Sequence, residues 1–97
     1  MTILVDSCLW HLRDLRWCHC VSDTSLDELH EFAATLGIPP RAFQGDHYDL
    51  HEERRATAIE LGALAVTSRE LLTRLKAANL RLAPDARRVW KAGRATG

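Results

Sequence analysis

The sequence predicts an α/β fold, in which a small mixed or parallel sheet of about four short strands is packed by three helices. Short apolar runs alternate along the chain with segments of helical periodicity, and this alternation is typical of a sheet that is at least partly parallel. The chain has 97 residues, 46% of them hydrophobic and 27% charged, which suffices for one modest core. We therefore expect one compact domain over residues 1–80, followed by a basic tail over residues 81–97.

The first half of the chain is expected to alternate strands with one helix. The expected elements are a strand at residues 3–6, a long polar loop at 7–16, a strand at 17–22, a helix at 25–36 and a brief strand at 41–44. The helix begins at a capping box, in which the side chains of Ser25 and Glu28 each bond a free backbone N–H group of the first turn. Gly37 ends it, and the two prolines that follow prevent its continuation.

The second half is expected to hold two further helices and a strand. One helix is predicted to open with Asp49 as its N-cap and to end at Gly62. Residues 63–66 form an apolar run that predicts the fourth strand. Thr67 and Glu70 make another capping box, and the leucines that follow at helical spacing give the third helix an apolar face.

Charge and cysteine content argue against several classes of protein. The 13 basic and 13 acidic residues cancel, which is not typical of a general nucleic-acid coat protein. No stretch approaches the ~18–20 apolar residues that a membrane span needs, and the N-terminus lacks the basic segment of a secretory signal. An odd number of cysteines argues against a disulfide framework. We expect a cytoplasmic protein with no membrane segment, in which Cys18 and Cys20 are buried apolar residues rather than zinc ligands.

The tail over residues 81–97 differs from the rest of the chain in its charge. It carries five basic residues and one acidic residue, so its charge is +4. We expect a frayed segment or a short helix around Trp90. This charge could contact nucleic acid or an acidic patch on the same domain, and a solvated extension is the alternative.

Polar residues follow each expected strand. They are Asp6 after the first strand, Ser22–Asp23 after the second, Gln44–His47 after the third and Thr67–Arg69 after the fourth. Because ligands of α/β proteins bind outside the carboxyl ends of the strands, we expect a site at this edge of the sheet. If the first two strands are antiparallel, Asp6 lies at the opposite edge from Asp23.

The densest polar cluster is the expected metal site. Asp46, His47 and Asp49 offer two carboxylates and an imidazole, which can hold a divalent cation. Carboxylates suit Mg²⁺ or Mn²⁺, and the imidazole shifts the preference toward manganese, iron or zinc. The alternative is structural, with Asp49 as a helix cap and Asp46 as a turn residue.

Asp6 and His19 are the expected catalytic residues, because a carboxylate at a strand end and an imidazole can act as general base and acid. The expected substrate-binding residues are Arg69, Ser68, Gln44 and Arg55. Two of them, Ser68 and Arg69, stand at the start of a helix, where backbone amides favour a phosphate. The alternatives are a packed core histidine for His19 and an exposed ion pair for Arg55.

Several stretches of the chain resemble a family of small bacterial and phage proteins known as domain of unknown function 4031. They are Val5-Asp6, Trp17-Cys18-His19, residues 25–33, Phe43-Gln44-Gly45-Asp46-His47-Tyr48-Asp49, Gly62-Ala63 and Thr67-Ser68-Arg69-Glu70. The resemblance covers residues 3–75, and Gly-Asp-His-Tyr-Asp is its most specific motif. Family members often have a second acid after the strand aspartate, where this chain has Ser7, so a paired-carboxylate role is not implied here. Some relatives are joined to a metal-dependent phosphohydrolase domain, which implies nucleotide-related work by association.

The function that these residues favour is a divalent-metal-assisted enzyme, or a pocket, that acts on a phosphate-bearing small molecule such as a nucleotide. The first alternative is a non-catalytic module that binds a nucleotide, a nucleic acid or a protein partner. The second is a buried network of histidines and aspartates that specifies the fold.

Overall fold

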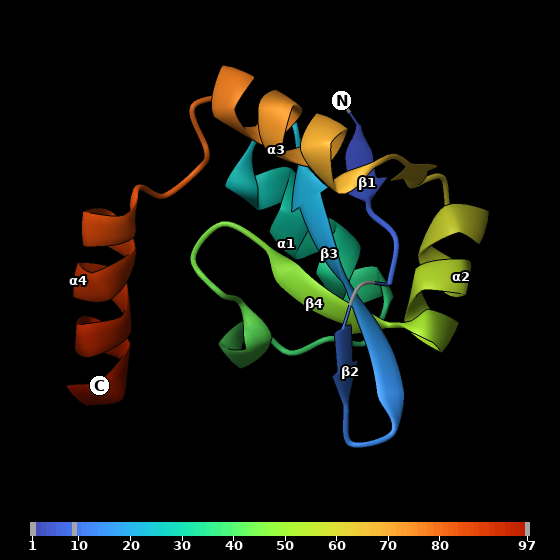
Figure 1. Ribbon diagram of the computed structural model, residues 1–97, viewed down its shortest axis with the longest axis horizontal. Coiled ribbons are helices and arrows are strands. Elements are labelled where there is room, and N and C mark those ends of the chain that lie inside the picture. Colours follow the sequence, from blue (N-terminus) through green and yellow to red (C-terminus); the bar gives the residue numbers. More distant parts are fainter. Residues whose placement is uncertain (1, 9, 97) are drawn as a thin grey trace.

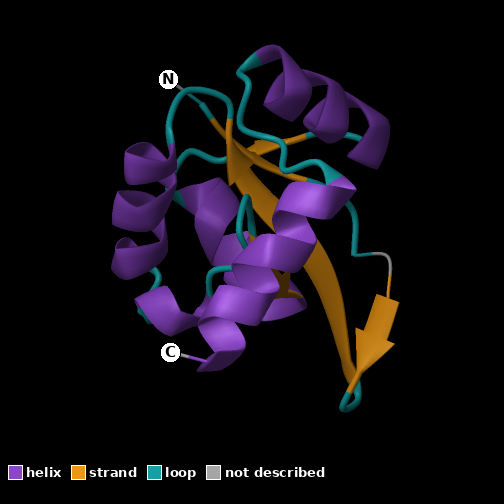
Figure 2. Ribbon diagram, turned by 90° about the vertical axis from the view of Figure 1, so that its left-hand side faces the viewer, coloured by secondary structure: helices purple, strands orange, loops and turns teal. Residues whose placement is uncertain are grey.

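The computed structural model describes residues 2–8 and 10–96 and shows a mixed sheet with helices on both faces (Figures 1 and 2). The strands of this part of the chain are β1 (Ile3–Val5), β2 (Trp10–Leu12), β3 (Leu15–Ser22), β4 (Tyr48–His51) and β5 (Leu64–Ala65). Its helices are α1 (Leu26–Thr35), the 3₁₀ turn η1 (Pro40–Ala42), α2 (Glu52–Glu60), α3 (Ser68–Ala77) and α4 (Pro84–Thr96). The α/β class and the mixed sheet that the sequence predicts are confirmed.

The long strand β3 organises the sheet, because it pairs antiparallel with β1, β2 and β4. Its first half pairs with β2 and its second half with β1, while β4 runs along its other edge. The strand β5 extends the sheet by pairing parallel with β1. Since β1 and β3 are antiparallel, Asp6 and Asp23 lie at opposite edges, and Asp23 instead accepts the backbone N–H of Thr2 at 3.1 Å.

Alternation along the strands divides the core between the two faces of the sheet. One face buries Val5, Cys18 and Cys20 against α1 and α2, so the two thiols are small apolar core residues as predicted. On the other face, Leu4 and Val21 pack with Leu71 and Leu75 of α3. His19 lies on β3 two residues before Val21, so alternation places it on this second face, beneath α3.

Two of the three expected helix starts are confirmed. The hydroxyl of Ser25 accepts the N–H of Glu28 at 3.1 Å, and that of Thr67 accepts the N–H of Glu70 at 3.0 Å. The third was assigned to the wrong residue. The N-cap of α2 is His51, which follows β4, and Asp49 lies inside that strand.

The expected strand at residues 41–44 is wrong. Pro40 fixes a backbone angle that suits the first turn of a helix, and Pro40–Ala42 form the 3₁₀ turn η1. The strand comes later, at Tyr48–His51, where Tyr48 and Leu50 are buried and alternate with more exposed neighbours. The motif residues Asp46 and His47 therefore precede a strand rather than follow one.

The expected loop at residues 7–16 is also wrong, since β2 and the start of β3 form a hairpin. Leu12 pairs with Leu15, and the two residues between them, Arg13 and Asp14, have φ angles of 54° and 65°. Two positive φ angles in a two-residue loop match a type I′ turn, which usually carries Asn-Gly or Asp-Gly. The usual sequence signal for this turn is missing here.

The C-terminal segment (residues 81–96) packs on the domain through Arg81, Leu82, Arg87 and Trp90. After α3 the chain passes through a short segment into α4, which ends near the C-terminus beside the loop before β4 (Figure 1). Trp90 of α4 contacts Phe43 with ring centroids 5.9 Å apart. Among the described residues, no helix has the length and apolar character required to cross a membrane.

The hairpin turn gives a test of the fold. Replacing Asp14 with glycine removes the cost of a left-handed conformation, so we expect Asp14→Gly to raise the free energy of unfolding by about 0.5–1 kcal/mol. The measurement is urea unfolding followed by circular dichroism. Ala34→Gly, at an exposed position inside α1, is the control and should lower the same free energy by about 1 kcal/mol. A loss of stability in Asp14→Gly would contradict the turn.

Candidate functional site

A cavity of about 250 Å³ lies on the α3 side of the sheet and collects polar residues from distant parts of the chain. Its lining consists of Asp6, His19, Val21, Asp46, His47, Ser68, Leu71, Leu72, Leu75, Arg81 and Arg87. The apolar wall comes mainly from α3, and the polar wall comes from the sheet, the loop before β4 and the C-terminal segment. Four of the residues that the sequence singled out, Asp6, His19, Asp46 and His47, thus share one hollow.

His19 is held in place by Asp6. The Nδ1 of His19 lies 2.8 Å from Asp6 Oδ2, and the backbone N–H of His19 donates to Asp6 Oδ1 at 2.7 Å. The hydroxyl of Ser68 donates to the same carboxylate at 2.9 Å. Burial raises the pKa of the Asp6 carboxyl, but the hydrogen bonds from His19 and Ser68 outweigh it and hold this pKa below its ordinary value. Asp6 is therefore an ionised acceptor that orients the imidazole.

His47 is held in the same way by Asp46. Its Nδ1 lies 2.7 Å from Oδ1 of Asp46, whose side chain is fully buried. Arg87 Nη2 donates to this carboxylate at 2.7 Å, Arg81 Nη1 at 3.2 Å and the backbone N–H of Leu82 at 3.0 Å. Burial raises the pKa of the Asp46 carboxyl, but these donors and His47 drive it far below its ordinary value. Both oxygens of Asp46 are engaged, so the structure does not leave this carboxylate open to a metal ion.

Gly45 allows the C-terminal segment to approach the motif closely. Its φ angle is +95°, and a Cβ atom at this position would lie 2.7 Å from Leu82 Cδ1 and 3.4 Å from the indole of Trp90. A glycine at this position therefore permits the left-handed backbone conformation and leaves room for the Leu82 and Trp90 side chains. It lets Leu82 and its neighbours reach Asp46.

The two histidines converge on Asp49. One possible ligand atom from each of His19, His47 and Asp49 lies within 4.8 Å of the others. Asp49 Oδ1 is 3.2 Å from His47 Nε2, but this contact is not aligned as a hydrogen bond, and the buried oxygen has no hydrogen-bond donor within the described chain. Burial lowers the pKa of His47, but its contacts with Asp46 and Asp49 outweigh this and raise it above the ordinary value.

These three residues could hold a metal ion. Each imidazole turns its Nδ1 to a carboxylate, which leaves Nε2 as the nitrogen available to an ion. Metal-bound histidines in proteins almost always have such an outer partner on the second nitrogen. Two imidazoles and one carboxylate suit zinc, manganese or iron better than magnesium.

The structure separates the expected substrate-binding residues. Ser68 lines the cavity, whereas Arg69 is exposed and is not among the described residues around it. Arg55 donates from Nε to the backbone oxygen of Asp6 at 2.6 Å, so it fixes the end of β1. Gln44 lies outside the lining, and its backbone oxygen accepts Arg87 Nη1 at 2.9 Å.

Arg81 and Arg87 line the cavity and were not predicted as site residues. Their segment was expected to be a tail, and the structure shows that its charge meets a carboxylate of the same domain, one of the alternatives left open above. The charge excess of residues 81–97 was the available signal. No local pattern shows that the partner is Asp46.

The fold and the site define a small α/β domain in which two carboxylate-oriented histidines and a third carboxylate meet on one face of the sheet. The model of a family described as "Protein of unknown function (DUF4031)" matches residues 3–78, and the chain belongs to this family. The family resemblance that the sequence showed is thereby confirmed. No curated protein and no solved structure matches the chain.

The raised pKa of His47 predicts a pH dependence for the metal-free protein. A histidine whose pKa is raised by folding contributes stability below its unfolded pKa of about 6.5, and this contribution is lost as the pH rises through the folded value. We expect the ring protons of His47 to titrate above this pH in NMR spectra. Asp46→Asn should lower the midpoint, and an unchanged midpoint in that variant would contradict the assigned pair.

The contacts of the C-terminal segment predict a difference between two neighbouring arginines. Arg87→Ala removes hydrogen bonds to the buried Asp46 carboxylate and to Gln44, so we expect it to lower the free energy of unfolding by about 2–3 kcal/mol. Arg88 is exposed and pairs with Asp85 one turn away, so Arg88→Ala should leave it nearly unchanged. Urea unfolding of both variants makes the comparison. Equal stability would show that the segment does not dock on Asp46.

Proposed function

We propose that this protein is a divalent-metal-dependent hydrolase of a phosphate-bearing small molecule such as a nucleotide, with the ion held by His19, His47 and Asp49. The observation that supports the proposal most is the pairing of each histidine with its own buried aspartate, so that both rings are fixed before an ion arrives. The buried Oδ1 of Asp49, which has no hydrogen-bond donor among the described residues, adds a third ligand. Within the described residues this oxygen faces His47 Nε2 at 3.2 Å, so an ion bound here would take the place of the His47 proton.

The donor set favours a transition-metal ion. Imidazole nitrogens suit Zn²⁺, Mn²⁺ and Fe²⁺, whereas Mg²⁺ prefers oxygen ligands and retains its water. Three protein ligands leave further positions for water and substrate, which is the arrangement of catalytic rather than structural sites. We therefore assign His19 to the metal and not to proton transfer, and Asp6 to the orientation of His19.

A phosphate group would find basic donors in the cavity beside the buried carboxylates of Asp6 and Asp46. Arg81 and Arg87 line it, and each has guanidinium donors in addition to the one that reaches Asp46. An ion held by His19, His47 and Asp49 would supply Lewis acidity, by polarising a phosphoryl oxygen and lowering the pKa of a bound water. The leucines of α3 keep the opposite wall apolar, which strengthens electrostatic interactions inside the cavity.

The same contacts weigh against a nucleic-acid module, the first alternative. Arg81 and Arg87 pair with Asp46, and Arg88 pairs with Asp85, so much of the positive charge of the segment is neutralised within the chain. Sequence-independent binding to nucleic acid depends on such charges being free for phosphates. A single small-molecule phosphate in the cavity needs far fewer free positive charges than a nucleic acid does.

We also propose a cytoplasmic location. Cys8, Cys18 and Cys20 are free thiols, and two of them are buried in the core. Unpaired cysteines are usual in a reducing compartment.

Calorimetric titration with Zn²⁺ or Mn²⁺ tests the metal site. We expect one ion per chain, with affinity that rises with pH because His47 must lose its proton. Asp49→Asn removes a ligand charge and the ion pair with His47, but Asp49 is partly exposed, so the variant should fold and lose at least about 10-fold in affinity. His11→Ala, at an exposed position on β2, is the control and should bind like the parent.

Hydrolysis is tested on the same proteins with p-nitrophenyl phosphate and its diester. We expect turnover that depends on added ion and that is lost in Asp49→Asn but not in His11→Ala. Metal binding without turnover would reduce the proposal to a metal-dependent pocket. Absence of metal binding in the parent protein would remove it altogether.

A further inference from the structure

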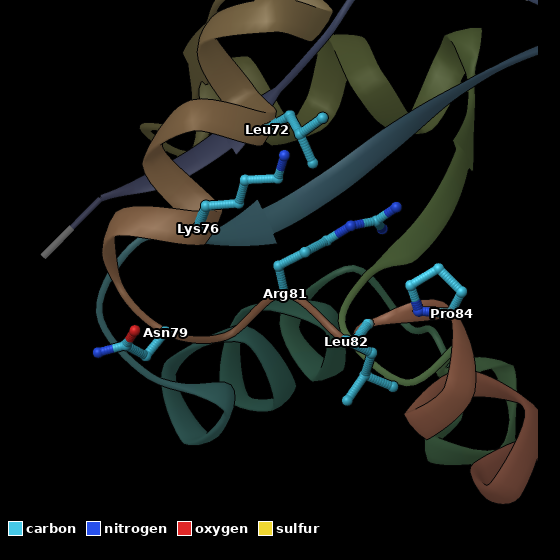
Figure 3. A pocket seen from close by; sticks show the side chains of 7 residues that line it. Leu72, Lys76, Asn79, Arg81, Leu82 and Pro84 are labelled. Atoms are coloured by element: carbon cyan, nitrogen blue, oxygen red, sulfur yellow. The ribbon is translucent and has the colours of Figure 1, made fainter.

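A second cavity of about 500 Å³ adjoins the cavity that His19 and His47 line, which we call the metal-site cavity. Figure 3 shows the second cavity. Its lining consists of Leu72, Lys76, Asn79, Arg81, Leu82, Ala83 and Pro84. Leu72 and Arg81 line both cavities, so the two hollows adjoin along these side chains. We call the second hollow the outer cavity.

The charged residues that line the outer cavity are both basic, although Arg81 is paired with Asp46. Lys76 and Arg81 line it, and none of its described lining residues is acidic. Figure 3 shows the two cations coming from different places, Lys76 from α3 and Arg81 from the segment that follows this helix. Lys76, together with the guanidinium donors of Arg81 that Asp46 does not use, favours an anionic ligand group.

Arg81 joins the two cavities. Its Nη1 lies 3.2 Å from Asp46 Oδ2, while its side chain is 39% exposed. A guanidinium has five N–H donors in a fixed plane, and the Asp46 contact uses one of them. The remaining donors can serve an anion on either side.

The outer cavity does not suit a nucleobase. Bases are usually held by stacking on aromatic rings, and the lining residues named above include no aromatic side chain. Leu72, Leu82 and Pro84 supply short apolar walls instead.

We propose that the outer cavity is a subsite for a second phosphate group, so that the substrate class is a molecule with two linked phosphates, such as a nucleoside diphosphate or a pyrophosphate ester. The inference rests on the proposed function, because the first phosphate occupies the metal-site cavity. Lys76 binds the second phosphate, and Arg81 lies between the two groups. The remainder of the substrate extends toward solvent past Asn79 and Pro84.

The test compares two non-hydrolysable probes, methylenediphosphonate and methylphosphonate, by calorimetry on protein loaded with one equivalent of Mn²⁺. We expect the diphosphonate to bind at least about 10-fold more tightly. Lys76→Ala should reduce this preference to about 3-fold or less and leave the affinity for methylphosphonate within about 2-fold of the parent. Lys76 is exposed, so this variant keeps the fold.

Arg69→Ala is the matched control, because Arg69 is an exposed cation on the same helix outside the described lining of both cavities. It should keep the full preference for the diphosphonate. If methylenediphosphonate withdraws some of the bound Mn²⁺, it does so equally in Lys76→Ala and Arg69→Ala. A difference in their preference for the diphosphonate therefore reports binding at the outer cavity.

Two results would overturn the subsite. They are equal affinity of the parent protein for both probes, and equal behaviour of Lys76→Ala and Arg69→Ala. If the ion still binds in either case, the proposed metal site stands and only the second phosphate is lost. If the ion does not bind, the proposed function fails, and the same comparison on the metal-free protein decides the subsite separately.

Discussion

The buried carboxylate of Asp46 is the constraint on which the site depends. A charged group without exposure is stable only with full compensation, and the loss of one of its partners is strongly destabilising. Here the compensation comes from His47, from the backbone of Leu82 and from two arginines. The C-terminal segment must therefore dock for the loop before β4 to keep its shape. Because the family match ends at residue 78, these arginines lie beyond the family region that they help to stabilise.

The fold was predictable where the cause is local. Ser25 and Thr67 cap their helices through side chains three residues from the groups they bond, so the sequence carries the whole signal. The hairpin was missed because Arg13-Asp14 forms a left-handed turn without the usual glycine, and the pairing of β2 with β3 stabilises it. The position of β4 was missed for a related reason. The motif before it was interpreted as a turn that ends a strand, whereas its second half begins one.

Four residues that the sequence singled out line one cavity, but the strand arrangement that brings them together was not predicted. Polar side chains were expected at the ends of parallel strands, but β4 begins where β1 ends, since Val5 and Tyr48 both pair with Cys20. The stagger between these strands, which no local pattern encodes, brings His47 and Asp49 beside His19. Composition alone cannot separate a carboxylate that binds an ion from one that orients an imidazole. The folded structure supplies the missing information, since both oxygens of Asp46 accept hydrogen bonds whereas Asp49 Oδ1 accepts none from the described residues.

The indole of Trp10 on β2 packs against the imidazole of His19, with ring centroids 4.8 Å apart and the planes tilted by 49°. The hairpin therefore brings a fluorophore into contact with one proposed ligand. Trp17 packs on His51 and Trp90 on Phe43. A paramagnetic ion bound at His19 would quench the fluorescence of Trp10, because the two rings are in contact. Tryptophan fluorescence would therefore report whether the proposed metal site is occupied.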